Sequence, residues 1–569
     1  MALQNFRSVE EIPQHFRKIF SQYVHFNFVQ SEVLDDIIYS DDSIVVSSPT
    51  GSGKTTIFEL AIVRLLMQNE NDTLGFKIVY ISPIKSLCQE RLVDWNNKFS
   101  RYGINCICVT GDSENVDFRN LVHHNLIIST PEKWDSLTRK WKDNENMVRI
   151  VKLFMIDEVH LLNEEDRGST LEVIVTRMKT VQNSISINDI ENCKIRFIAV
   201  SATIGNVEDI AEWIGSTKYF RFPDEIRPVH LNKIILGFNS HQNNHFKFDL
   251  SLNYRLQSLL IQYSEGKPAL IFCSTRKSVE MTAKHLLQTL NIKLDFSQIE
   301  KLQQLSQTIS DLKIKEMIKN GIGVHHAGMD PRTRHIVEEI FRGGDLPIMI
   351  ATSTLAMGVN LPAHLVIIKS TKCYTNRGFQ DYSATAIHQM IGRAGRPQFD
   401  TSATALILTT NDDKDKIEKM LSSTEPIESN LHRHLTEHLN AEVVLGTITG
   451  LDVALQWLAS TFLYIRARAN PRHYGLSLNY TKDQLDRKLL EFADMRLRVN
   501  DKKTLNLLNK NAKKQTIRFP LNGKIKTWDM KVNCIIQAVL GNLEITDVNI
   551  QTESYQILRS AQRIIKYSG

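Results

Sequence analysis

The feature that most constrains the fold is an alternation along the first 410 residues, where short apolar, β-branched runs are separated by stretches of helical periodicity. Such strands, connected through helices, are typical of parallel α/β sheets. The Pro-punctuated segment 219–231 separates two series of runs and is suited to a hinge. Two α/β domains in tandem are therefore predicted. The runs are 43–48, 76–82, 125–130, 151–156 and 195–200, then 268–274, 346–353, 364–370 and 404–409.

A helical region follows the second series. Beyond residue 412 the apolar residues recur mostly at helical spacing, as in 441–467. A chain of 569 residues is too long for a single core, so three or four domains are expected. The apolar runs are too short to span a membrane, and the first residues lack the apolar core of a signal peptide. We therefore expect a soluble intracellular protein with no membrane partner.

The cysteines and the charge balance narrow the function classes. Seven scattered cysteines without a CxxC pair argue against a disulfide framework and against zinc. Cys106 and Cys108 share one face of the probable strand 104–110 and are expected to be core thiols. The net charge of +6 comes from 69 basic and 63 acidic residues, a small excess for this length. Charge alone therefore hints at nucleic acid without establishing it.

The stretch SSPTGSGKT (47–55) lies between the first predicted strand and a helical stretch. This setting is typical of a phosphate-binding loop, whose backbone amides and helix dipole hold nucleotide phosphates. Lys54 is expected to reach the β- and γ-phosphates, and Thr55 to ligate Mg²⁺. Ser48 stands where the strict pattern has glycine. The predicted ATP-binding residues of this loop are Pro49, Thr50, Gly51, Ser52, Gly53, Lys54, Thr55 and Thr56.

Two carboxylates follow the predicted strand 151–156, at the sheet edge where open α/β sheets bind ligands. Asp157 is expected to hold Mg²⁺, directly or through water, and Glu158 to orient and deprotonate the attacking water. A capped strand end with two solvated acids is the alternative. The upstream loop favours the catalytic interpretation, so ATP and Mg²⁺ are the predicted cofactors.

The third element of the predicted site is 388–400, where Gln389, Arg393 and Arg396 follow one another at spacings of four and three. We expect these side chains on one face of a helix. Guanidinium groups bind phosphate through paired hydrogen bonds, and an arginine finger contributes roughly 10³–10⁵ in rate. A basic helix face exposed to solvent is the alternative. The order of the three elements favours a motor whose two lobes close over ATP and part after hydrolysis.

Together these motifs resemble the superfamily-two DExH helicases, and within them the Ski-two-like group. The DEVH stretch adds His160 to the predicted catalytic residues, and 26–31 resembles the motif in which Gln30 reads adenine. The resemblance covers roughly residues 20–480 and implies two RecA-like domains. Further similar motifs are 82–91, 110–112, 130–135, 201–203, 271–278, 324–329 and 351–363.

The resemblance also implies a set of nucleic-acid contacts. Small polar side chains and main-chain amides hold the phosphodiester backbone, so binding that is indifferent to base sequence is expected. The turn at Arg377, flanked by Tyr374 and Phe379, matches a strand-separating hairpin of relatives, with an ordinary surface hairpin as the alternative. For any single Ser or Thr, a turn or cap role is the alternative. The predicted contacts besides Arg377 are Ser82, Lys85, Ser86, Thr110, Gly111, Thr130, Ser274, Thr275, Arg276, Thr352 and Thr354.

Longer stretches resemble the meiotic crossover DNA helicases of the Mer-three type, namely 157–181, 353–371, 389–407, 440–475 and 497–538. This resemblance implies a nucleic-acid-stimulated ATP hydrolase, a 3′-to-5′ DNA helicase that unwinds branched recombination intermediates in the nucleus and promotes meiotic crossovers. Its expected partners are single-stranded and branched DNA and recombination proteins. The alternatives are an RNA helicase of the same group, and a truncated nucleic-acid-binding ATPase without unwinding activity.

The resemblance divides the chain into four expected domains. In relatives the winged helix continues into a long helical ratchet domain, whereas here the two stretches meet almost at once, so part of both is expected to be missing. The chain also ends within the ratchet-like region. The expected domains are an ATP-binding RecA-like domain at 1–225, a helicase C-terminal RecA-like domain at 226–412, an incomplete winged helix at 413–490 and a partial ratchet-like helical domain at 491–569.

Overall fold

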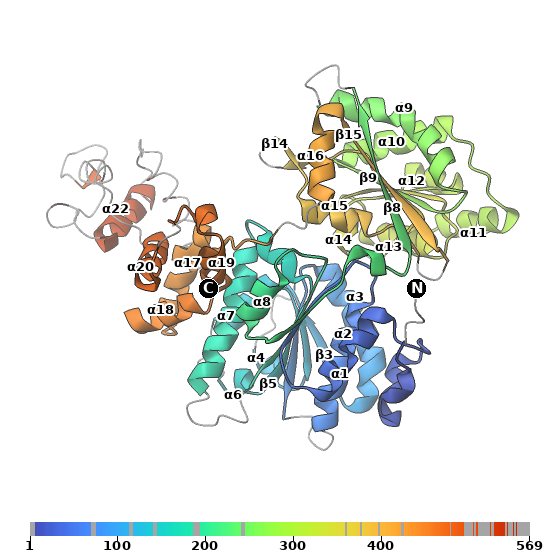
Figure 1. The fold of residues 1–569 in the computed structure, drawn as a ribbon. Coiled ribbons are helices and arrows are strands. Elements are labelled where there is room, and N and C mark those ends of the chain that lie inside the picture. Colours follow the sequence, from blue (N-terminus) through green and yellow to red (C-terminus); the bar gives the residue numbers. More distant parts are fainter. Residues whose placement is uncertain are drawn as a thin grey trace. The chain divides into compact units, whose positions relative to one another are not determined.

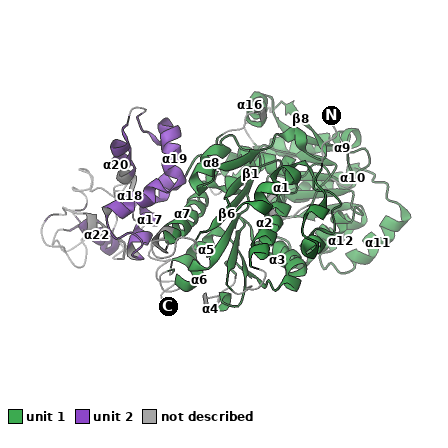
Figure 2. Ribbon diagram, turned by 60° about the horizontal axis from the view of Figure 1, so that its bottom comes forward, with its two compact units in different colours: residues 1–429 green, residues 430–569 purple. Residues whose placement is uncertain are grey.

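The computed structural model divides the chain into two compact units, residues 1–429 and 430–569 (Figure 2). The first unit contains two parallel sheets flanked by helices (Figure 1). We call the part built on the first sheet lobe 1 and the part built on the second sheet lobe 2. The structure describes residues 6–69, 75–112, 118–139, 141, 145–185, 194–239, 245–358, 361–375, 378–396, 399–422, 426–477 and 480–493, then 505, 508–509, 524, 528–540, 543, 550 and 554.

Lobe 1 is built on a seven-stranded sheet whose pairings are parallel. The central strands are almost entirely buried, because helices cover both faces and the residues are apolar and β-branched. In spatial order the strands are β3 (Cys106–Val109), β4 (Leu126–Ser129), β2 (Lys77–Ile81), β5 (Val151–Ile156), β6 (Arg196–Ser201), β1 (Ile44–Ser47) and β7 (Lys218–Arg221).

Two groups of helices cover this sheet. On one face, α1 (Phe28–Tyr39), α2 (Lys54–Gln68) and α3 (Lys85–Phe99) share a core with alternate strand residues such as Met155. On the other, Trp134 packs against Phe154. Trp134 lies on α5 (Pro131–Thr138), which contacts α7 (Gly168–Ile185), and α8 (Val207–Ile214) contacts β1 and β7. Shorter elements are η1 (Val9–Glu11), η2 (Gln14–Phe20), η3 (Ser100–Tyr102), α4 (Phe118–Leu121), α6 (Glu145–Arg149), η5 (Val159–Asn163) and η6 (Asp224–Ile226).

Lobe 2 repeats this architecture with a six-stranded parallel sheet. Its strands in spatial order are β10 (Ile322–His325), β11 (Ile348–Thr352), β9 (Ala269–Cys273), β12 (Leu365–Ile368), β15 (Ser402–Thr410) and β8 (His230–Phe238). Its helices are α9 (His245–Tyr263), α10 (Arg276–Thr289), α11 (Phe296–Ser306), α12 (Leu312–Lys319), α13 (Pro331–Arg342), α14 (Thr354–Gly358), α15 (Ala384–Ile391) and α16 (Asn411–Ser422). The predicted two-lobed α/β class is therefore confirmed.

The hairpin predicted between Tyr374 and Phe379 is present. Strands β13 (Lys372–Thr375) and β14 (Gly378–Asp381) pair antiparallel and place these two aromatic residues opposite each other. Their rings meet edge to face at a centroid distance of 5.3 Å, and the Tyr374 side chain is 64% exposed. Arg377 lies outside the described residues.

Each of the nine predicted apolar runs overlaps a strand, and the probable strand at 104–110 is β3. Three further strands, β7, β8 and β10, are absent from the predicted runs. Strands β7 and β8 lie at sheet edges, where most of their side chains are exposed or half-buried and form no continuous apolar pattern. The predicted hinge is consequently shorter than 219–231, because β7 extends to Arg221 and β8 begins at His230.

The carboxyl ends of the two sheets follow one plan. In lobe 1, β3, β4 and β2 lie side by side and precede the predicted nucleic-acid contacts, whereas β5, β6 and β1 precede the predicted catalytic and nucleotide motifs. In lobe 2, β10, β11 and β9 occupy the matching end of the sheet and precede motifs of the predicted second grip. Each sheet thus brings its predicted nucleic-acid contacts together at one end.

The second unit is mostly helical among its described residues. Its helices are α17 (Leu431–Val444), α18 (Leu451–Ala459), α19 (Phe462–Ala469), η7 (Pro471–Tyr474), α20 (Lys482–Ala493) and α22 (Trp528–Leu540). A small core near its end joins Leu505, Leu508, Cys534, Ile535, Ala538 and Ile550. Among the described helices of both units, none combines the length and apolar character that a bilayer crossing requires.

Candidate active site

The loop after β1 has the geometry of a phosphate cradle. Gly51 and Gly53 adopt φ values of +83° and +79°, in the left-handed region that glycine tolerates best. A Cβ on Gly53 would lie 2.3 Å from the Gln30 side-chain nitrogen, so space also requires glycine at this position. Gly53 is the N-cap of α2, and the helix therefore begins with its free amides at the loop.

Lys54 begins α2 and folds over the loop. Its Nζ donates to the Ser48 carbonyl at 3.0 Å and lies 3.4 Å from the Pro49 carbonyl. Desolvation lowers the pKa of Lys54, against the opposing pull of the Glu158 and Asp157 carboxylates. The ammonium group is therefore bonded to the loop carbonyls within electrostatic reach of the two acids, and a polyphosphate would give it stronger partners.

Ser48 fits the position at which the strict pattern has glycine. It is fully buried, its amide donates to the Ser201 carbonyl at 3.1 Å, and its hydroxyl lies 2.8 Å from that of Ser52. The serine side chain therefore adds one contact within the loop, while the backbone amide, which glycine would also supply, holds the loop against β6.

Gln30 supports the loop from α1. It forms a capping box with Asn27, whose amide donates to Gln30 Oε1 at 2.9 Å. Gln30 Nε2 donates to the Gly53 carbonyl at 3.2 Å, and Asn27 Nδ2 to the Ser52 carbonyl at 2.9 Å. Gln30 is 1% exposed, so its predicted contact with adenine stays a prediction, while its contact with the loop is a finding.

The two acids follow β5 as predicted. Asp157 is joined to β2 by its amide, which donates to the Ile81 carbonyl at 2.9 Å, and by Tyr80, whose hydroxyl donates to Asp157 Oδ2 at 2.5 Å. Burial and the neighbouring Glu158 carboxylate raise the pKa of Asp157 to about 6. Glu158 adopts φ of +54°, a strained value for a residue with a Cβ and one often found at functional sites.

Burial would by itself raise the pKa of Glu158, but His160, Lys54 and Arg393 outweigh it and lower that pKa. Glu158 is therefore held as the carboxylate, the form that can accept a proton from water. One of its oxygens, Oε2, is buried without a hydrogen-bond partner among the described residues.

His160 links these acids to lobe 2. Its Nδ1 lies 3.1 Å from Ser201 Oγ and 3.3 Å from Glu158 Oε2, and its Nε2 lies 3.1 Å from Gln389 Nε2. Burial lowers the pKa of His160, so the neutral ring is favoured. With Gln389 donating to Nε2, the ring proton is on Nδ1 and faces Ser201 and Glu158.

The arginines do not lie on the predicted helix. α15 carries Gln389 but ends at Ile391, and Arg393 and Arg396 follow in the turn beyond it. Gly392 caps the helix, and Gly395 has φ of +102°, a conformation that cannot continue a helix. The predicted helical face for all three residues was therefore wrong.

The two arginines differ in their surroundings. Arg393 donates from Nε to the Ala356 carbonyl of α14 at 3.0 Å. Desolvation lowers its pKa, and the Glu158 carboxylate of the other lobe acts in the opposite direction. Arg396 instead forms a two-point ion pair with Asp400, with Nε–Oδ2 and Nη2–Oδ1 distances of 2.9 and 3.2 Å. Arg393 is thus electrostatically part of the site, whereas Arg396 is bound within lobe 2.

Two inter-lobe contacts were not predicted from the sequence. Arg227, in the linker between the lobes, donates from Nη2 to the Ala394 carbonyl of lobe 2 at 3.0 Å. Gly392 lies so close to the phosphate loop that a Cβ on it would be 2.8 Å from Thr50 Cβ. No local pattern marks either contact, since both depend on the packing of one lobe against the other.

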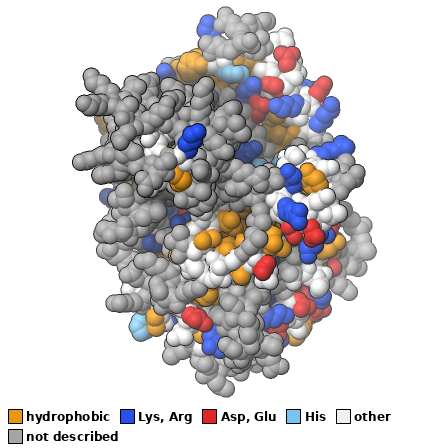
Figure 3. Space-filling model, turned by 90° about the vertical axis from the view of Figure 1, so that its left-hand side faces the viewer, with side chains coloured by type: hydrophobic (Ala, Val, Ile, Leu, Met, Phe, Trp, Pro, Cys, Tyr) orange, Lys and Arg blue, Asp and Glu red, His pale blue; other side chains and the backbone are white. Residues whose placement is uncertain are grey.

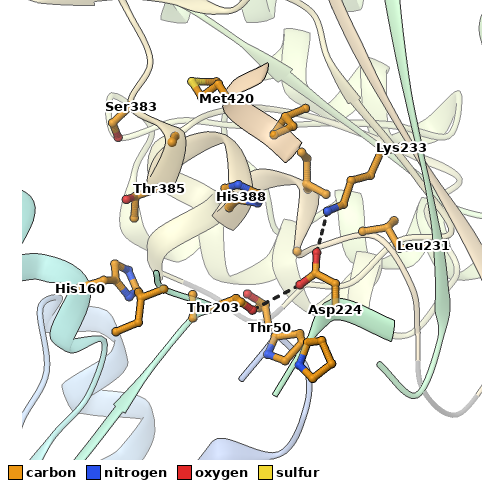
Figure 4. A pocket seen from close by; sticks show the side chains of 18 of the residues that line it. Thr50, His160, Thr203, Asp224, Leu231, Lys233, Ser383, Thr385, His388 and Met420 are labelled. Carbon is orange, nitrogen blue, oxygen red and sulfur yellow. Dashed lines mark hydrogen bonds and ion pairs between the residues drawn. The ribbon is translucent and has the colours of Figure 1, made fainter. Parts of the chain in front are cut away.

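A cavity of about 760 Å³ lies between the lobes beside this site (Figure 4). It is lined by Thr50, by His160, by the linker and by the first turn of α15. Asp224 of the linker accepts from Lys233 Nζ at 2.6 Å and from Thr203 Oγ1 at 3.3 Å. The linker is thereby connected to the motif at 201–203.

A short strap returns the chain from lobe 2 to lobe 1. Asn206 bonds both backbone groups of Ile427, accepting from its amide at 2.7 Å and donating to its carbonyl at 3.1 Å. The Glu428 amide donates to Asn163 Oδ1 at 3.2 Å, and Ser429 Oγ to Glu172 Oε2 at 2.6 Å. We call residues 426–429 the strap. Its partners follow the predicted catalytic motif 157–160 and the helicase-like motif 201–203.

The predicted ATP-site threonines and nucleic-acid contacts differ in exposure. Thr55 is half-buried and Thr56 is buried with its hydroxyl 3.3 Å from that of Tyr23. Of the strand contacts, Lys85, Ser86, Gly111, Arg276 and Thr354 are exposed, Ser274, Thr275 and Thr352 are half-buried, and Ser82, Thr110 and Thr130 are buried. Some side chains have local partners, such as the Lys85–Asp112 ion pair at 2.6 Å and the Thr275 cap of α10. The side chains of Ser82, Thr110 and Thr130 can contact a nucleic-acid strand only after a rearrangement of their surroundings.

The charge on the described surface is mixed. On the face drawn in Figure 3, basic and acidic side chains are interspersed. This agrees with the small net charge of +6 and favours a few phosphate contacts over a long electrostatic footprint.

Comparison with protein families gives four matches along the chain. A DEAD/DEAH box helicase domain matches residues 27–210, and a helicase conserved C-terminal domain matches 294–398. A winged helix-turn-helix domain matches 428–506, and a Sec63 Brl domain matches 490–568. The last two matches overlap, so the two modules meet without a connecting segment.

Curated relatives align along nearly the whole chain. "Probable ATP-dependent DNA helicase HFM1" of Homo sapiens is 44% identical over 638 residues, 99% of this chain and 44% of the relative. The Mus musculus protein of the same name is 45% identical over 639 residues, with the same coverage. "ATP-dependent DNA helicase MER3" of Saccharomyces cerevisiae is 41% identical over 468 residues, 81% of this chain and 38% of the relative.

The chain spans less than half the length of these relatives. The human alignment is also longer than the 569 residues of this chain, so the relative contains residues within the aligned region that this chain lacks. Fold, motif order, family matches and relatives agree. The chain therefore belongs to the Ski-two-like group of superfamily-two DExH helicases.

Proposed function

We propose that the chain is an ATP-driven DNA helicase whose hydrolytic site is completed by both lobes. The observation that carries this proposal is the connection Glu158–His160–Gln389, in which Glu158 Oε2 of lobe 1 lies 3.3 Å from Nδ1 of one imidazole and Gln389 on α15 of lobe 2 bonds its Nε2. Because this ring contacts both lobes, a change at the γ-phosphate that moves Glu158 would also alter the contact with lobe 2. Such coupling between hydrolysis and lobe movement is what translocation requires.

In this proposal lobe 1 supplies binding and the base. The amides of the phosphate loop and Lys54 hold the phosphates of ATP, while Glu158 orients and deprotonates water. Thr55 and Asp157 fit a Mg²⁺ ion, because a hydroxyl at the loop and a carboxylate at the neighbouring strand end are oxygen ligands of the kind this cation prefers. When bound, Mg²⁺ would neutralise phosphate charge.

Lobe 2 supplies the arginines. Arg393 is already within electrostatic reach of Glu158 and would stabilise the charge that develops on the transferred phosphoryl group. Arg396 would join it after leaving Asp400, and its catalytic role is the more demanding part of the proposal.

The substrate assignment rests on the relatives. These relatives are named as ATP-dependent DNA helicases, which favours DNA over RNA as the substrate. The 3′-to-5′ direction, the preference for branched recombination intermediates, the meiotic crossover role, recombination partners and a nuclear location follow from resemblance to the Mer-three type. The exposed Lys85, Ser86 and Arg276 support a grip on the phosphodiester backbone.

Two assays test the proposal. Steady-state ATP turnover with single-stranded DNA and RNA of equal length and sequence should show stronger activation by DNA. Stronger activation by RNA would favour the RNA helicase of the same group.

A fluorescent strand-displacement assay with 3′- and 5′-tailed duplexes then tests unwinding and direction. Displacement of the 3′-tailed duplex is expected. Stimulated turnover without displacement of either substrate would identify a nucleic-acid-dependent ATPase that has lost unwinding.

A further inference from the structure

Tyr80 lies on β2, directly beside the strand that ends in the catalytic acids. It pairs with Met155 in the parallel register of β2 and β5. From this position its hydroxyl reaches across to the Asp157 carboxylate and donates to Oδ2 at 2.5 Å. Among the described residues this is the side-chain hydrogen bond that Asp157 receives.

The Tyr80 ring is fixed on both sides. It meets Phe58 of the phosphate-loop helix α2 at a centroid distance of 5.4 Å and Trp95 of α3 at 4.8 Å, both edge to face. The residue is 1% exposed, so the ring cannot turn without repacking this part of the core. The hydroxyl is therefore held in one place by apolar packing.

Tyr80 also stays a donor. A phenol is protonated at neutral pH, so its hydroxyl is the donor in the bond to the Asp157 carboxylate. A buried carboxylate is costly unless it is hydrogen-bonded, and a bond to a charged acceptor is among the stronger ones. The bond occupies Oδ2 and restricts rotation of the carboxylate.

We propose that Tyr80 is a positioning residue that fixes the Asp157 carboxylate for the Mg²⁺ of a bound nucleotide. The proposal rests on the proposed ATPase function and deepens it. The hydroxyl acts through Asp157 and touches neither nucleotide nor metal. Its loss should therefore weaken metal-dependent nucleotide binding and leave metal-free binding unchanged.

The experiment uses the full chain and a fluorescent, non-hydrolysable ATP analogue. Equilibrium binding is measured during a Mg²⁺ titration and, separately, in EDTA, for the wild type and Tyr80→Phe. The Phe ring keeps the contacts with Phe58 and Trp95 while removing the hydroxyl. Tyr102→Phe is the matched control, because Tyr102 of lobe 1 donates instead to the His15 carbonyl, at 2.9 Å.

The half-saturating Mg²⁺ concentration is expected to rise about tenfold in Tyr80→Phe, with binding in EDTA within twofold of the wild type and an unchanged melting temperature. Tyr102→Phe should match the wild type. An unchanged Mg²⁺ requirement, or equal weakening with and without Mg²⁺, would overturn the positioning role. Failure of the wild type itself to bind the analogue would overturn the proposed function instead.

A double-mutant cycle with Asp157→Asn separates positioning from general stability. If Tyr80 acts through Asp157, Tyr80→Phe has no further effect on the Mg²⁺ requirement in the Asp157→Asn background. An undiminished additional effect in that background would show that Tyr80 acts through another group and would overturn the inference.

Discussion

The two halves of the candidate active site differ in their readiness for chemistry. In lobe 1, Lys54 bonds the loop within electrostatic reach of the pair Asp157–Glu158, and the backbone amides of Ser48 and Asp157 bond neighbouring strands. In lobe 2, Arg393 bonds the Ala356 carbonyl and Arg396 is clamped on Asp400. Lobe 1 is therefore the more preorganised half: we expect it to bind a nucleotide by moving Lys54 from the loop carbonyls to phosphate, whereas lobe 2 has to exchange the partners of both arginines.

From this difference we expect lobe 2 to be the part that responds to the nucleotide. A conformational change follows a ligand only when the ligand interacts differently with the two states. An arginine that leaves an internal partner for a phosphate provides such a difference. The residues that decide whether ATP is hydrolysed should therefore be separable from those that decide whether it is bound.

The largest expected effect is in lobe 1. Glu158→Gln removes the candidate base, so stimulated ATP turnover should fall roughly 10²–10⁴-fold while nucleotide binding is retained. Lys54→Ala should lose turnover together with binding. Phosphate release in the presence of single-stranded DNA measures both. The exposed Glu32 of α1 gives the matched control, since Glu32→Gln should turn over ATP normally; near-normal turnover in either test variant would refute the assigned roles.

An intermediate effect is expected where the lobes touch. In Gly392→Ala, the new Cβ would lie 2.8 Å from Thr50 Cβ, so the lobes must separate or the loop must shift. Because the backbone at this position suits alanine, the folded lobe should tolerate the change. Stimulated turnover should fall about tenfold, on the order of 1.4 kcal/mol in barrier height.

Gly450→Ala is the control for that substitution, because a Cβ there meets nothing within 4 Å. Equal turnover of Gly392→Ala and the wild type would show that the close approach of Gly392 to Thr50 has no part in the working cycle.

A smaller effect on turnover is expected at the strap. Asn206→Leu removes both bonds to Ile427, a loss of about 1–3 kcal/mol that is confined to the docking of residues 426–429. Because the loss is confined to the docking of the strap, ATP turnover should stay within about threefold of the wild type. The docked Glu428, only 8% exposed, should become a cleavage site for a glutamate-specific protease.

Asn206→Asp keeps the acceptor for the Ile427 amide and should show intermediate cleavage. Mass spectrometry of the fragments locates the cut. Continued protection of Glu428 in Asn206→Leu would show that the strap is held without Asn206.

The features of the fold and the site that short sequence patterns encode could be predicted. The phosphate loop and the acids after β5 follow directly from strand–loop–helix patterns, and the structure places them together. The helical face for Arg393 was wrong because two glycines end α15 earlier than the spacing alone suggests. The edge strands β7 and β8 escaped prediction because their exposed side chains lack an apolar pattern.

Contacts between segments distant in sequence were harder to predict. The bonds from Arg227 to α15's end and from Asn206 to the strap join residues more than 160 positions apart and leave no periodic signal. In the sequence, Tyr80 is simply one residue of an apolar run that predicts a buried strand, although its hydroxyl bonds Asp157. Its hydroxyl gains a role only once β2 and β5 are paired.

The two-lobe site is tested most directly by ATP turnover of Arg393→Ala, measured beside equilibrium binding of the nucleotide. Binding should stay within about twofold of the wild type, because lobe 1 is preorganised, while stimulated turnover should fall roughly 10³-fold or more. The exposed Arg342 provides the control substitution. Near-wild-type turnover by Arg393→Ala, with nucleotide still bound, would show that hydrolysis does not need the second lobe.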